Sequence, residues 1–125
     1  MILESAELAS RALARSKPHS IQVLDTVTRY WSYASSNPDA KVIIFIHGYR
    51  GNHHGLEAIA GALEDFHVII PDLPGFGEST PFVGEHSIDS YSKWLAEFIK
   101  KLNPKQKPIL LGHSFGSIIC SAFAS

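Results

Sequence analysis

The 125-residue sequence predicts an α/β protein in which a predominantly parallel sheet is flanked by helices. Strand-like and helix-like segments alternate after residue 40, as in right-handed βαβ units. Residues 42–46 form an unbroken apolar run, which favours a strand covered on both faces. The third observation is a Gly-x-Ser-x-Gly sequence at 112–116, placed between a strand-like run and a helix-like one.

The composition is that of a globular domain with one core. Hydrophobic residues make up 45% of the chain, charged residues 18%, and the formal net charge is −1. This charge provides no electrostatic argument for binding nucleic acid or an anionic membrane surface. Cys120 is the sole cysteine, so no internal disulfide can form. We expect a cytoplasmic protein with no nucleic-acid partner and no membrane association, and the oligomeric state stays open.

The predicted elements divide the chain into a helical arm at 1–20 and a sheet core at 21–125. The arm holds a helix at about 2–16, either packed on the core or partly frayed. Period-2 and apolar patterns predict strands at 21–24, 27–33, 41–46, 67–70 and 108–111. A 3.6-residue period predicts helices at 53–63, at 88–102 and from 115 to the end.

Ser114 is the candidate nucleophile. Gly112 and Gly116 flank it where a side chain would collide with a sharp strand-to-helix turn. Such a turn holds its central residue in a strained conformation and directs the hydroxyl out of the sheet. The backbone amide of Phe115, at the start of the following helix, is then one expected donor to an oxyanion. The alternative is a strand–turn–helix joint with an incidental serine.

Two other loops follow strands that are expected to run parallel to the strand before Ser114. One begins at His47 and Gly48, and the other begins at Asp72. Binding sites in parallel sheets lie beyond the carboxyl ends of the strands, so both loops should approach Ser114 in one crevice. The backbone amide of Tyr49 is the second expected oxyanion donor.

A general base for Ser114 is harder to find, since all seven histidines precede it in the chain. His113 should point away from its neighbour across the turn. We expect His47 to brace its own loop through a hydrogen bond and not to act in catalysis. Asp72 is expected to accept hydrogen bonds from backbone amides of the Pro74–Gly75 loop.

The same histidines suggest a metal alternative, in which His47, His53 and His54 surround zinc. No carboxylate or second ligand cluster joins them at a recognisable spacing. The sequence therefore predicts neither a metal site nor a cofactor.

These features resemble the α/β-hydrolase-fold family over residues 41–124. The resemblance is carried by the apolar strand leading into 47–49, the Gly- and Pro-rich loop at 71–79, and the turn at 112–116. A serine at the centre of the turn indicates the serine-nucleophile branch of that family. By this resemblance, residues 1–125 are expected to be the N-terminal part of a single α/β-hydrolase domain, an incomplete fold that ends after the helix following Ser114.

The resemblance implies roles for these residues. Ser114 is the implied nucleophile, Tyr49 and Phe115 the implied oxyanion amides, and the triad acid and histidine are implied to follow the nucleophile in the order Ser, Asp or Glu, His. Only eleven residues follow Ser114, so both are expected to have no counterpart here. The implied activity is hydrolysis of an ester, thioester or related small-molecule acyl substrate. The alternative is a non-catalytic, truncated remnant that binds a ligand or partner.

Overall fold

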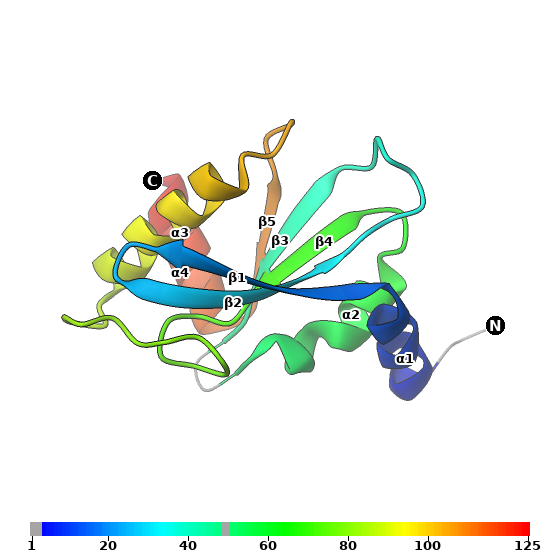
Figure 1. Cartoon of the computed structure of the whole chain (residues 1–125), viewed down its shortest axis with the longest axis horizontal. Helices are drawn as coiled ribbons and strands as arrows, with labels where there is room; N and C mark the ends of the chain where they lie inside the picture. Colours follow the sequence, from blue (N-terminus) through cyan, green and yellow to red (C-terminus); the bar gives the residue numbers. More distant parts are fainter. Residues whose placement is uncertain (1–3, 49–50) are drawn as a thin grey trace.

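The computed structural model describes residues 4–48 and 51–125 of the chain (Figure 1). Its strands are β1 (Ser16–Val23), β2 (Thr26–Tyr33), β3 (Val42–Ile46), β4 (His67–Pro71) and β5 (Ile109–Gly112). Its helices are α1 (Ser5–Arg15), the short 3-10 helix η1 (His53–Leu56), α2 (Glu57–Ala62), α3 (Ile88–Leu102) and α4 (Phe115–Ala124). Every element that the sequence predicts is present, and most boundaries agree within two residues.

The described strands form one mixed sheet in the order β1-β2-β4-β3-β5. The sequence led us to expect a predominantly parallel sheet, and this expectation is wrong. β4, β3 and β5 pair in parallel, but β1 pairs antiparallel with β2, and β2 pairs antiparallel with β4. The N-terminal hairpin is the reason for the difference, because its two eight-residue strands supply the longest ladder of the sheet.

The hairpin also differs from its prediction, in which strands at 21–24 and 27–33 left residues 25–26 for the turn. β1 begins at Ser16, so the strand takes up residues 16–20 that we had expected in the helical arm. This stretch is polar and contains Pro18, features that an edge strand tolerates and that weaken its sequence signal. The turn falls at Leu24–Asp25, with Leu24 in the left-handed region at φ 54°.

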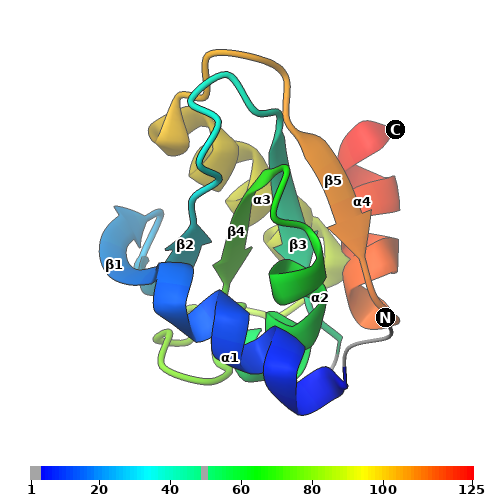
Figure 2. The ribbon, with the colours of Figure 1, turned by 90° about the vertical axis from the view of Figure 1, so that its right-hand side faces the viewer.

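Helices cover both faces of the sheet, which gives the molecule two hydrophobic layers. Figure 2 shows α1 and α2 in front of the sheet and α3 behind it. The α3/α4 face buries Val23, Ile44, Ile46, Trp94, Leu95, Phe98 and Ile119. The α1/α2 face buries Ala12, Trp31, Tyr33, Phe45, Leu56 and Ala60. β3 contributes to both, which explains its unbroken apolar run.

The N-terminal helix is packed against the core and is not a frayed arm over its described residues. The Arg15 guanidinium donates to four backbone carbonyls, those of Tyr33, Ala34, Ala60 and Phe66. It thereby joins the end of α1 to β2, α2 and the entry to β4. The helices approach so closely that a Cβ at Gly61 would lie 1.8 Å from the carbonyl oxygen of Leu8.

Over residues 4–48 and 51–125, no helix combines the length and the apolar character that crossing a lipid bilayer requires.

Candidate active site

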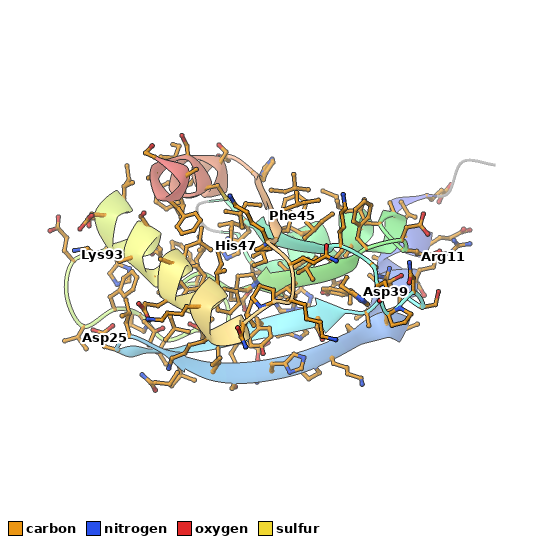
Figure 3. All side chains as sticks on the ribbon, turned by 90° about the horizontal axis from the view of Figure 1, so that it is seen from above. Arg11, Asp25, Asp39, Phe45, His47 and Lys93 are labelled. Carbon is orange, nitrogen blue, oxygen red and sulfur yellow. The ribbon has the colours of Figure 1, made fainter. Side chains whose placement is uncertain are left out.

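The carboxyl ends of β3, β4 and β5 lie at one edge of the sheet, as the sequence predicts. Parallel pairing aligns Ile46 of β3 with Gly112 of β5, and Ile44 of β3 with Ile69 of β4. The loops that begin at His47 and Asp72 therefore emerge beside the turn that carries Ser114. Figure 3 shows His47 in the interior of the molecule, whereas labelled residues such as Arg11 and Asp39 lie at its periphery.

The turn between β5 and α4 has the strained geometry predicted for it. Ser114 adopts φ 56° and ψ −120°, a conformation that L-residues rarely occupy. A Cβ at Gly116 would lie 2.1 Å from the carbonyl oxygen of Ile46, and one at Gly112 would lie 2.5 Å from the Gly116 backbone. Both glycines are therefore required by backbone contacts, which fix the serine in this position.

Ser114 is exposed and lines a cleft of about 290 Å³. The other residues lining the cleft are His47, Gly48, Gly51, Asn52, Gly55, Leu56 and His113. Gly48 brings the loop after β3 against the turn, since a Cβ there would lie 3.1 Å from Cβ of Ser114. Within the described part of the chain, no side chain forms a hydrogen bond with Ser114 Oγ. The hydroxyl is thus accessible from the cleft.

His47 connects two of the three loops. Its Nε2 accepts a hydrogen bond from the Leu73 amide at 2.9 Å, so the proton must reside on Nδ1, which donates to the Gly48 carbonyl at 2.7 Å. Burial lowers the pKa of His47 against the opposing effects of the Gly48 hydrogen bond and the Asp72 charge. Both ring nitrogens of this neutral imidazole are engaged, so His47 braces its loop and is not placed to act as a base.

Asp72 is fully buried and links the loop after β4 to the start of η1. Its Oδ1 accepts from the backbone amide of His53 at 2.7 Å and from Nδ1 of the same residue at 2.9 Å, while Oδ2 accepts from the Glu78 amide at 2.9 Å. Burial opposes its ionisation, but these hydrogen bonds outweigh burial and lower the pKa of Asp72. Asp72 thus accepts from one backbone amide of its own loop, that of Glu78, and from one outside it, that of His53, which the sequence did not lead us to expect.

Of the two expected oxyanion donors, the structure describes Phe115 but not Tyr49. Phe115 is the first residue of α4, and backbone N–H groups in a first helical turn point out of the helix toward bound anions. Tyr49 lies outside the described residues, so its amide stays a prediction.

The structure also brings His53 and His54 together with two residues that the sequence pattern did not single out, Trp31 and Glu57. His53 is buried between Asp72 and the face of Trp31, on which its ring stacks. Its neighbour His54 places Nδ1 2.7 Å from Oε1 of Glu57, a largely buried carboxylate. The His54–Glu57 spacing of three residues in a helical turn was the available signal. His47, which the zinc alternative included, does not belong to this cluster.

The strained serine between β5 and α4, at the carboxyl edge of a mixed sheet covered on both faces, defines a class of protein. The chain belongs to the alpha/beta hydrolase fold family, whose model matches residues 41–125.

Particular relatives agree with this assignment. Lipase 3 from Moraxella sp. (strain TA144) is 33% identical over 92 residues, and Phospholipase YtpA from Bacillus subtilis (strain 168) is 33% identical over 94 residues. These matches cover 73% and 71% of this chain, and 29% and 36% of the relatives. The crystal structure of lip1 from Acinetobacter baumannii AYE superimposes with a TM-score of 0.82 at 26% identity, over 99% of this chain and 42% of that one. The chain thus spans well under half the length of each.

Proposed function

We propose that the protein is a serine hydrolase that cleaves an ester, thioester or related acyl substrate with Ser114 as the nucleophile. The observation that carries the proposal is the conformation of Ser114, exposed at φ 56° on the wall of the cleft, at the N-terminus of α4. Local strain of this kind persists where function requires it. The names of Lipase 3 and Phospholipase YtpA support an ester as the substrate.

The proposed reaction proceeds in two stages. Ser114 Oγ attacks the acyl carbon while a base removes its proton, and the bond to the leaving group breaks as that group takes up the proton. Water then hydrolyses the acyl-enzyme by the reverse path. The amides of Phe115 and Tyr49 are the proposed donors to the oxyanion, each worth about 3 kcal/mol in the barrier.

The base and its orienting acid are proposed to follow Ser114 in the chain. Nδ1 of His47 is hydrogen-bonded to the Gly48 carbonyl, and Nδ1 of His53 to the Asp72 carboxylate. Over residues 4–48 and 51–125, no histidine bonds the Ser114 hydroxyl. The order Ser, acid, His that the family uses would supply both missing groups from the downstream part of the full-length protein.

A fluorophosphonate probe on the full-length protein tests this proposal. We expect covalent labelling of the wild type and none of Ser114→Ala, whose kcat/KM toward a p-nitrophenyl ester should fall by at least about a thousandfold. Ser121→Ala is the matched control, because Ser121 is exposed on the same helix and its hydroxyl makes no contact with the turn. A folded wild type that neither labels nor turns over esters would support the non-catalytic alternative.

A further inference from the structure

A cluster of side chains of the types that ligate metals lies at the junction of η1 and α2. One ring nitrogen each of His53 and His54 and a carboxylate oxygen of Glu57 lie within 4.8 Å of one another. Their rings are adjacent, with centroids 3.9 Å apart. The carboxylate that the sequence pattern lacked for a zinc site is therefore supplied by Glu57.

The cluster has the hydrogen-bonding support that metal-binding histidines usually require. Nδ1 of His53 donates to the buried carboxylate of Asp72, which fixes the tautomer and leaves Nε2 with its lone pair. A carboxylate behind a histidine in this way orients the ring and raises its basicity toward a metal. The side chains of His53 and Asp72 are 3% and 0% exposed, so this pair is rigid.

The surroundings of the cluster carry an excess of buried negative charge. Glu57 and Asp72 are both buried, and the partner of Glu57, the His54 ring, is mostly exposed. The nearby Tyr33 hydroxyl is buried and has no hydrogen-bond partner among the described residues. Burial raises the pKa of Tyr33, and the charges of Glu57 and Asp72 raise it further. A cation at this position would offset the cost of burying two carboxylates.

We propose that His53, His54 and Glu57 bind a zinc ion, with His53 coordinating through Nε2 and Asp72 supporting that ring. Two imidazoles and one carboxylate form a ligand set that suits Zn²⁺ and leaves its fourth position to water. Donor atoms of a tetrahedral zinc site lie about 3.3 Å apart, so the present separations must close. His54 can make this movement, because its side chain is 63% exposed, whereas those of His53 and Glu57 are 3% and 10% exposed.

Zinc binding at this position would fasten the loop after β3 to the body of the domain. The hydrogen bond between His54 Nδ1 and Glu57 Oε1 would break as both atoms turn to the metal, and the imidazole would keep its proton on Nε2. η1 directly follows Gly51 and Asn52, which line the cleft, and through Asp72 it is tied to the loop after β4. The ion would therefore be a structural one that holds a wall of the cleft in place.

Thermal unfolding of the metal-free, full-length protein with and without added Zn²⁺ tests the proposal. We expect Zn²⁺ at a hundredfold excess over its Kd to raise Tm by about 5–10 °C, and calorimetry to give one ion per chain. His54→Ala and Glu57→Gln should each weaken zinc binding by more than about a hundredfold, because a lost ligand costs more than a lost supporting group. Mg²⁺, which prefers oxygen ligands, should produce no shift.

Two control variants test whether zinc binding depends on this cluster. His86→Asn removes an exposed histidine outside the cluster, and its amide can replace the donor to Tyr91, so zinc binding should be unchanged. Ser114→Ala should also bind zinc normally, which separates this proposal from the proposed hydrolase activity. The proposal is overturned if Zn²⁺ causes no shift, or if the shift persists in both His54→Ala, which alters an exposed side chain, and Glu57→Gln.

Discussion

Two turns at the carboxyl edge of the sheet are held in shape by different forces. The turn at 112–116 is held by steric contact, because its two glycines touch backbone where no side chain fits. The loop at 72–78 contains a buried carboxylate, that of Asp72, which accepts hydrogen bonds from two segments of the chain. The stability contributed by the first turn should therefore depend on side-chain volume and not on pH, whereas that contributed by the second should depend on pH.

The largest expected loss of stability comes from adding a side-chain atom to the turn at 112–116. Gly116→Ala places a Cβ 2.1 Å from the Ile46 carbonyl oxygen, and a backbone atom cannot yield as a side chain can. We expect a loss of about 3 kcal/mol or more in the free energy of unfolding, measured by urea denaturation. Gly84→Ala is the control, because a Cβ there meets nothing within 4 Å and should change stability by less than about 0.5 kcal/mol. Similar losses in both variants would contradict the steric account.

A smaller loss of stability is expected from removing the charge of Asp72 in the loop at 72–78. Asp72→Asn keeps the shape of the side chain but weakens its three hydrogen bonds, so unfolding at neutral pH should become easier by about 2–3 kcal/mol.

The pKa shift of Asp72 also predicts how its contribution to stability changes with pH. The pKa of Asp72 is lowered by folding, so its contribution is complete above the unfolded value of about 3.9 and is lost as pH falls through the folded value. Urea denaturation as a function of pH should show a shallower acid decline for Asp72→Asn than for the wild type. Parallel acid declines would show that another group carries the dependence.

The smallest effect concerns His47, which borders both turns. Folding lowers the pKa of His47, so its contribution is complete above about pH 6.5 and is lost as pH falls through the folded value. In His47→Gln the side-chain oxygen can still accept from the Leu73 amide, but the side chain does not titrate. We expect a cost of about 1 kcal/mol at pH 8 that narrows toward pH 5. A cost independent of pH would show that His47 does not titrate on unfolding.

Much of the site could be predicted because its signals are local. Glycine on both sides of Ser114 marks a turn that other residues cannot form, and the structure shows that turn. The helix caps are local as well, since Asn52 Oδ1 accepts from the His54 amide and Ser87 Oγ accepts from the Ser90 amide. Each of these features depends on residues within a few positions of one another.

What the sequence determined by itself was therefore the order of the elements, the strained serine and the edge at which its neighbours would gather. Tertiary structure alone decided how far the antiparallel part of the sheet extends, because the polar strand at 16–20 gains its partners only from the hairpin. It also decided the buried pairing of His53 with Asp72, which are 19 positions apart and meet because the parallel pairing of β3 with β4 brings their loops together. Periodicity reports which face of an element is buried, but it carries no information on which distant side chain will share that burial.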